Sequence, residues 1–286
     1  MTFSIVAYDP HDKAWGVAIA SKILAVGAIC PYARVGAGAI ATQSYSNVSF
    51  GPEGLDSMAR GYSAQTTLDR LLANDKRASF RQVGMVDAYG GVATHTGADC
   101  ASWAGSVVGE YFAIQGNILT GEEVIYAMRD AFQSTSGDLA TRLFNALQAG
   151  DEAGGDSRGR QSAALLVAKL HGGLGRLEDR FVDLRVDDDP APSKKLFELL
   201  MIHRLYYTQT QPQDILEIDT DLAHELQLGM QQAGLLTWID AQWGEVGIRA
   251  FESYLAKENL SACWNVNEPH RIDRKLVDYL RLRFKN

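Results

Sequence analysis

The sequence is poor in cysteine and has fewer basic than acidic residues. Its 3 cysteines, Cys30, Cys100 and Cys263, are odd in number and far apart, which favours reduced thiols over a disulfide framework. No Cys-x-x-Cys or His-x-x-x-His pair occurs, so the sequence indicates neither a metal site nor a metal cofactor. The 27 basic residues against 35 acidic ones give a net charge of -8 without any basic run. We therefore expect no nucleic-acid or membrane partner.

Long apolar runs are missing as well. No stretch reaches the length that spans a bilayer, and the first residues lack the basic-then-apolar pattern of a signal peptide. We therefore expect a cytoplasmic protein. With 286 residues, 46% of them hydrophobic, the chain can form one large domain or a domain with a smaller appendage.

Alternating and helical segments come in separate blocks. Residues 2–8 and 15–21 alternate on either side of turn-forming residues 9–12, which predicts a β-hairpin. Further strands are expected at 35–43, 82–87, 91–96, 111–115, 161–169 and 180–186, and helices at 51–74 (two, joined near Gly61), 121–132 and 138–149. Blocks of this kind favour an α+β fold over a doubly wound parallel sheet. After Pro190 the chain is mainly helical, with a linker at 208–213 and no obvious strand in 214–286.

The second residue is the first candidate for chemistry. Thr2 stands at the head of an alternating strand, and removal of Met1 would give it a hydroxyl nucleophile and a free α-amine that can act as its base. The alternative is that Thr2 simply begins a strand, as β-branched residues often do.

Two polar segments could belong to a binding site. Gln43 to Asn47 follow a small-residue strand, where amides and hydroxyls could orient a substrate or stabilise an oxyanion, although a solvated loop would look the same. In the glycine-rich segment 154–162, Arg158 and Arg160 could bind a carboxylate, and Asp156 could hold an amine or an arginine. An exposed turn held by an Asp-Arg pair is the alternative.

Other motifs carry less weight. Residues 36–41 superficially match a dinucleotide fingerprint, but they lie within the apolar run and are not followed by a helix. The acidic residues between 183 and 189 lack the spacing of a calcium loop, which favours a charged strand end. His95 ends a predicted strand and could act as acid, base or substrate donor, but it has no identifiable carboxylate partner.

Taken together, these motifs resemble a known family. The segments that carry the resemblance include Met1-Thr-Phe-Ser-Ile-Val-Ala, Ala41-Thr-Gln43, Phe50-Gly-Pro52, His95-Thr-Gly97, Gln115-Gly-Asn117, Gly154-Gly-Asp156 with Arg158-Gly-Arg-Gln-Ser-Ala-Ala164, and Asp183-Leu-Arg-Val-Asp187. Over about residues 1 to 205 they are similar to the uncharacterised family DUF1028, which looks like a branch of the N-terminal nucleophile (Ntn) hydrolases. The resemblance implies a four-layer αββα sandwich over residues 1–207. The tail, 214–286, more loosely resembles a small helical peptidoglycan-binding-like domain.

The resemblance also implies an activity and a set of roles. Thr2 would be the nucleophile of a hydrolase that acts on a small amide or peptide-like substrate, without a cofactor, and Ser21 would orient its amine. The substrate-binding residues would be Gln43, Asn47, His95, Asn117, Asp156, Arg158, Arg160 and Gln161. A non-catalytic protein that binds a carboxylated ligand on the same scaffold is the alternative. Because sandwich domains of this apolar content commonly self-associate, we expect a homodimer.

Overall fold

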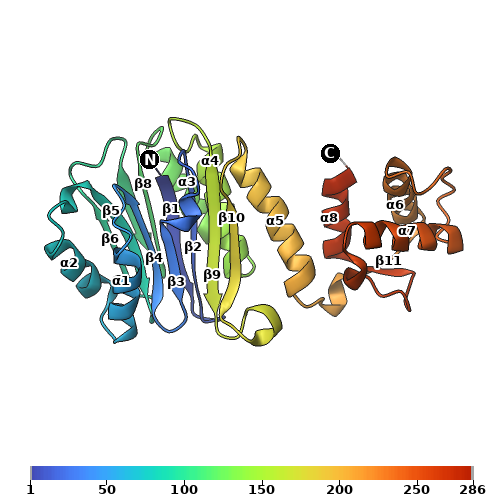
Figure 1. Cartoon of the computed structure of the whole chain (residues 1–286), viewed down its shortest axis with the longest axis horizontal. Helices are drawn as coiled ribbons and strands as arrows, with labels where there is room; N and C mark the ends of the chain where they lie inside the picture. The colour runs from blue at the N-terminus through green and yellow to red at the C-terminus, as the bar shows by residue number, and fades with distance from the viewer. Residues whose placement is uncertain (1, 285–286) are drawn as a thin grey trace. The chain divides into compact units, whose positions relative to one another are not determined.

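The computed structural model describes residues 2–284, and the chain divides into two compact units (Figure 1). The units are Met1–Phe197 and Glu198–Asn286, so the division falls inside the long helix α5, Pro192–Tyr207. Each unit has its own core and is described by itself. No helix within the described residues is both long and apolar enough to cross a membrane.

The first unit contains two antiparallel sheets. The larger has the order β10-β9-β2-β1-β8-β7 and the smaller the order β3-β4-β5-β6. The strands of the larger sheet are β1 Thr2–Asp9, β2 Ala14–Ser21, β7 Gly105–Gly109, β8 Phe112–Asn117, β9 Ser162–Lys169 and β10 Arg180–Val186. Those of the smaller are β3 Pro31–Arg34, β4 Gly38–Ser44, β5 Arg81–Asp87 and β6 Val92–Thr96.

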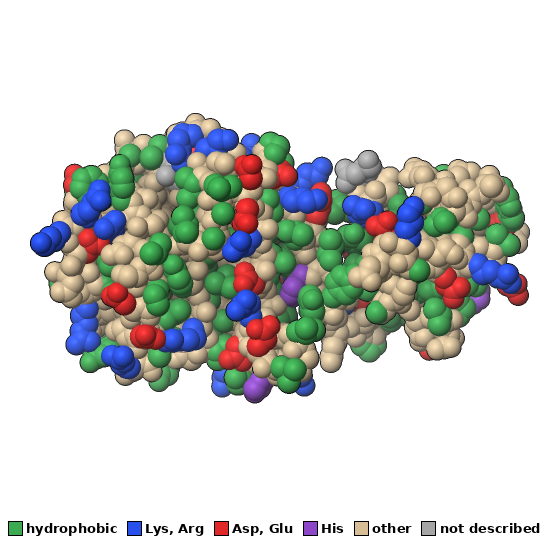
Figure 2. Space-filling model, viewed as in Figure 1, with side chains coloured by type: hydrophobic (Ala, Val, Ile, Leu, Met, Phe, Trp, Pro, Cys, Tyr) green, Lys and Arg blue, Asp and Glu red, His purple; other side chains and the backbone are tan. Residues whose placement is uncertain are grey.

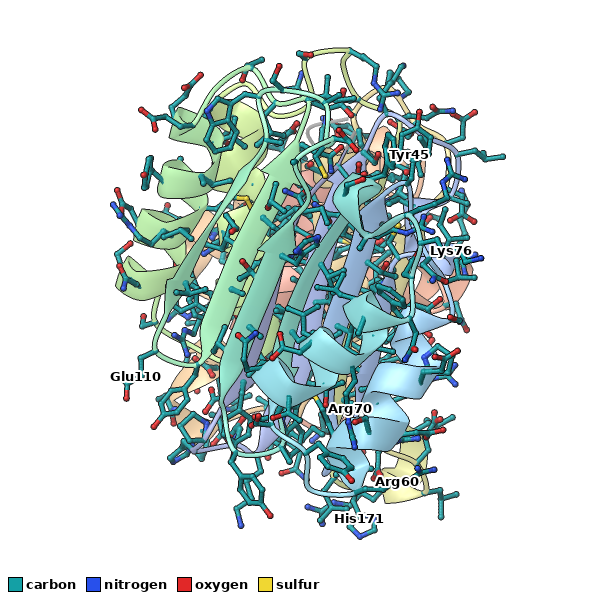
Figure 3. All side chains as sticks on the ribbon, turned by 90° about the vertical axis from the view of Figure 1, so that its left-hand side faces the viewer. Tyr45, Arg60, Arg70, Lys76, Glu110 and His171 are labelled. Carbon is teal, nitrogen blue, oxygen red and sulfur yellow. The ribbon has the colours of Figure 1, made fainter. Side chains whose placement is uncertain are left out.

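Helices cover the outer face of each sheet, and the inner faces pack against each other (Figures 1 and 3). Helices α1 Phe50–Ala59 and α2 Ala64–Ala73 contact the smaller sheet, while α3 Glu123–Ser134 and α4 Leu139–Glu152 contact the larger one. Because the side chains of a strand alternate between faces, nearly every strand residue near the centre is buried on one side or the other. In β1, for example, Val6 belongs to the core between the sheets.

The space between the sheets changes character along the strands. One end is apolar and is filled by Val6, Trp15, Val17, Ala39, Ala41, Val86 and Ala113. Toward the other end the same strands carry Thr2, Ser4, Gln43, Gln82, Gln115 and Asn117, all buried. Buried polar groups are costly unless they are hydrogen-bonded, so this end needs a hydrogen-bond network of its own.

The predicted α+β class and most predicted elements are confirmed. The 2–21 hairpin, the two helices before and after Gly61, and the 82–96 hairpin are present, and Ser63 caps α2 by accepting a hydrogen bond from the Thr66 amide. The predicted strand at 35–43 was wrong at its start, because Gly36 turns the chain with φ +71° and β4 begins at Gly38. Strands β3 and β7 were not predicted.

The second unit is mainly helical but also contains a small sheet. Its helices are α6 Thr220–Gln232, α7 Glu245–Lys257 and α8 Arg274–Phe284. The expectation of no strand in 214–286 was wrong, since β11 Ile215–Glu217 pairs with β12 Arg271–Asp273. The core centres on Phe251, whose ring packs edge-on against Trp243 and Trp264. Short 3-10 helices in the two units are Val26–Ala28, Ala78–Phe80, Leu174–Arg176, Pro212–Asp214 and Ser261–Cys263.

Candidate functional site

Strand register brings the polar residues to one edge of the two sheets. Thr2 pairs with Asn117 and Ser21 pairs with Ser162 in the larger sheet. Gln43 pairs with Gln82 in the smaller sheet. Figure 3 marks this end by Tyr45, which directly follows β4, with Arg60 and His171 at the opposite end.

Thr2 is buried and its side chain is placed by hydrogen bonds. It is 3% exposed, and its Oγ1 lies 3.0 Å from Ser21 Oγ. Its carbonyl oxygen accepts hydrogen bonds from Gln43 Nε2 at 3.2 Å and Asn117 Nδ2 at 3.5 Å. The predicted removal of Met1 concerns a residue outside the described part of the chain. The geometry thus brings together four of the predicted site residues: Thr2, Ser21, Gln43 and Asn117.

A network of amides connects the two sheets beneath Thr2. Gln82 Oε1 accepts hydrogen bonds from Gln43 Nε2 and Asn117 Nδ2, each at 2.8 Å. Deeper in the sandwich, Ser4 Oγ donates to Gln43 Oε1 at 2.6 Å and accepts from Gln115 Nε2 at 2.5 Å. Networks of this kind are rigid when all their members are satisfied.

Two acceptors in the network have no hydrogen-bond partner within the described residues, Gln115 Oε1 and Asn117 Oδ1. Gln115 Oε1 lies against Gly84, where an added Cβ would come within 2.0 Å of it. The glycine therefore leaves room for the glutamine side chain that crosses from the opposite sheet.

The glycine-rich loop 153–161 borders this edge. Buried Asp156 accepts a hydrogen bond from the Lys22 amide at 2.8 Å, which connects the loop to the end of β2. Arg158 pairs with Asp156 at 3.2 Å, and Arg160 pairs with Asp151 at 2.7 Å. Both guanidinium groups are exposed, and Figure 2 shows a group of basic side chains at the upper end of this unit.

The comparisons with known proteins identify the family. A model described as a family of unknown function, DUF1028, matches residues 2–196. The chain belongs to the DUF1028 family. It is also similar to the crystal structure of a DUF1028 protein from Silicibacter pomeroyi, with 30% sequence identity over 71% of this chain and 89% of that chain, at a TM-score of 0.65. No match was found among the curated proteins.

Three predicted site residues of this DUF1028 protein lie elsewhere. Asn47 donates to Asp75 Oδ2 at 3.0 Å and accepts from the Ser49 amide, so it fixes the loop after β4. His95 pairs with Val83, which belongs to the core under α1 and α2, and its ring contacts the Ala78 carbonyl oxygen at 2.9 Å. His95 is therefore on the helix side of its sheet. Gln161 donates to Asp188 at 3.0 Å.

Ser4, Gln82 and Gln115 are site residues of this DUF1028 protein that were not predicted from the sequence. For Ser4 and Gln115 a signal was present, because each is a polar residue in an otherwise apolar strand, two positions from Thr2 or Asn117 and so on the same face. Gln82 lies beside Gln43 only through the register of β4 and β5.

Two other chemistries would need a reactive thiol or a metal centre. Burial raises the pKa of the Cys30 thiol to about 11, so it is a poor nucleophile at neutral pH. Within residues 2–284, no three His, Cys, Asp or Glu side chains are grouped in a way that could hold a metal ion.

Proposed function

We propose that this protein is an amide hydrolase of the N-terminal nucleophile type, with Thr2 as the nucleophile once Met1 has been removed. The observation that carries the proposal is the buried Thr2 hydroxyl, 3.0 Å from Ser21 Oγ at the edge of two facing sheets. The paired sheets with helices outside support assigning the first unit to the four-layer αββα sandwich of the Ntn hydrolases.

The reaction begins with attack of Thr2 Oγ1 on the substrate carbonyl carbon. The hydroxyl proton passes to the Thr2 α-amine, directly or through one water, and then to the leaving nitrogen as the C–N bond breaks. Water hydrolyses the resulting ester and returns the hydroxyl. The unperturbed pKa of an α-amine, about 7.7 to 8.0, suits a base that works near neutral pH.

The neighbouring residues have positioning and binding roles in this proposal. Ser21 orients the Thr2 hydroxyl, while Gln43 and Asn117 hold the Thr2 carbonyl and so fix the backbone that carries the nucleophile. Arg158 and Arg160, from the loop that precedes β9, form the exposed polar wall toward a small amide or peptide-like substrate.

Intact mass and one substitution test the proposal. We expect the mature chain to begin at Thr2, and Thr2→Ala to lower turnover by at least about 1,000-fold without loss of fold, measured over a panel of amides, lactams and N-acylated amino acids. Thr2→Ser, which keeps a hydroxyl and an amine, is the matched control and should retain measurable turnover. A mature chain that keeps Met1, or full turnover by Thr2→Ala, would overturn the proposal.

The same variants separate the alternative function. A protein that only binds a carboxylated ligand would bind it equally well with Thr2→Ala, and would lose affinity with Arg158→Ala. The expected homodimer would have twice the chain's 31.3 kDa mass in light scattering. The cytoplasmic location and the peptidoglycan-binding-like character of the second unit are also proposals; cell fractionation and sedimentation with purified peptidoglycan test them.

A further inference from the structure

An acceptor oxygen beside Thr2 is unsatisfied within the described residues. Asn117 is 1% exposed, yet its Oδ1 has no hydrogen-bond partner there. Buried polar atoms in native proteins nearly always have a partner, and leaving one without costs free energy. The partner of this oxygen is therefore a donor outside the hydrogen bonds of the described residues: a water, a ligand or the amine of a mature N-terminus.

The network fixes which end of the Asn117 amide lacks a partner. Gln82 Nε2 donates to the carbonyl oxygens of Gly116 at 2.7 Å and Gly105 at 3.2 Å, and these atoms can only accept. Gln82 Oε1 must therefore be the atom that faces Asn117, and it accepts a hydrogen bond from Asn117 Nδ2 at 2.8 Å. Rotating either amide would place two acceptors or two donors face to face. The atom without a partner is thus the acceptor Oδ1 of Asn117.

We infer that Asn117 Oδ1 accepts a hydrogen bond from the α-amine of Thr2 and positions that amine as the base. Thr2 and Asn117 are register partners on neighbouring strands, and the same side-chain amide already contacts the Thr2 carbonyl. An acceptor cannot stabilise an oxyanion, but an N-terminal amine has N–H groups to donate. The inference rests on the proposed function in requiring that Thr2 be N-terminal.

The hydrogen bond has a measurable electrostatic consequence. An acceptor stabilises an ammonium more than a neutral amine, so Asn117 raises the pKa of the Thr2 amine relative to a site without it. The charged or titratable groups around the same edge are Lys22, Asp151, Asp156, Arg158 and Arg160, together with the buried thiol of Cys30. All of these remain when Asn117 alone is replaced.

The test is an NMR titration of the Thr2 α-amine in the full chain. The chain is labelled with ¹⁵N-threonine, and cleavage of an N-terminal fusion makes Thr2 its first residue. We expect Asn117→Leu to lower the amine pKa by about one unit. Gln115→Leu is the matched control, because it removes a buried amide of the same network whose strand partner is Ser4. It should leave the amine pKa unchanged.

An unchanged amine pKa in Asn117→Leu, or an equal shift in Gln115→Leu, would overturn the inference. If Asn117→Leu fails to fold, Asn117→Ser replaces it, because serine is smaller but keeps an acceptor oxygen. We expect this variant to lower the amine pKa by less than Asn117→Leu would. A higher KM for Asn117→Leu with an unmoved amine pKa would assign Oδ1 to the substrate and also overturn the inference. If the pKa shifts but Thr2→Ala keeps full turnover, the proposed function fails and the positioning role stands.

Discussion

At the residue scale, Gly84 shows how one missing side chain makes room for the site. A Cβ at this position would lie 2.0 Å from Gln115 Oε1 and 2.5 Å from Gln115 Cδ. We expect Gly84→Ala to lower the free energy of unfolding by about 1 to 3 kcal/mol, because the amide cannot move without breaking its bonds to Ser4. Urea unfolding measures the change. In a double-mutant cycle, the variant that carries both Gly84→Ala and Gln115→Ala should lose less unfolding free energy than the two single variants lose together. Additive losses would contradict the predicted clash.

The Asp75 carboxylate makes the free energy of unfolding depend on pH. A hydrogen bond from Arg81 is the main cause that holds the pKa of Asp75 at about 2, below its ordinary 3.8, and the two side chains are only 8% and 11% exposed. Because the pKa is lower in the folded state, the stabilisation is complete above about pH 5 and is lost progressively as the pH falls toward about 2. We expect Asp75→Asn to be less stable than the wild type at pH 6, with a difference that closes over this range. Asp56→Asn, from the exposed pair Arg34–Asp56, should show almost no difference at either pH in urea unfolding.

At the element scale, the two helices on the outer face of the larger sheet begin differently. The Asp138 side chain caps α4 by accepting from the Thr141 amide at 2.9 Å, whereas Glu122 at the start of α3 makes no side-chain cap. We therefore expect Asp138→Ala to cost about 1 kcal/mol of unfolding free energy and Glu122→Ala less than about 0.5 kcal/mol. Equal losses in thermal or urea unfolding would show that the cap contributes nothing.

Elements with a strong local pattern could be predicted from the sequence, and those defined by distant partners could not. The β1–β2 hairpin and α2 have clear periodicity, turn residues and, for α2, a serine cap. Strand β3 has four residues and lies at a sheet edge. Strand β7, also at an edge, is partly buried on one face and exposed on the other, but its sequence Gly-Ser-Val-Val-Gly does not alternate between polar and apolar residues, so it lacks the sequence signal of a half-buried strand. Gln82 and Gln115 form a site only because strands from opposite sheets meet, which no local pattern shows.

At the scale of the whole molecule, the two units have separate cores. The family match, residues 2–196, falls within the first unit, and the second is built around Phe251 between two tryptophans. Compact units with separate cores commonly unfold separately. We therefore expect calorimetry of the full chain to show two transitions.

Replacing one aromatic residue in each core assigns the transitions. Phe251 is fully buried, with ring centroids 5.5 Å from Trp243 and 5.0 Å from Trp264, so Phe251→Ala should cost the second unit about 3 to 5 kcal/mol. The unfolding transition of the second unit, followed by tryptophan fluorescence, should therefore move to a lower temperature. The transition of the first unit and any Thr2-dependent turnover should stay unchanged. Phe132→Ala is the matched variant, since Phe132 is 1% exposed and packs 5.0 Å from Phe112 in the first unit. It should move only the other transition; a single transition that shifts with both variants would mean that the two cores unfold as one.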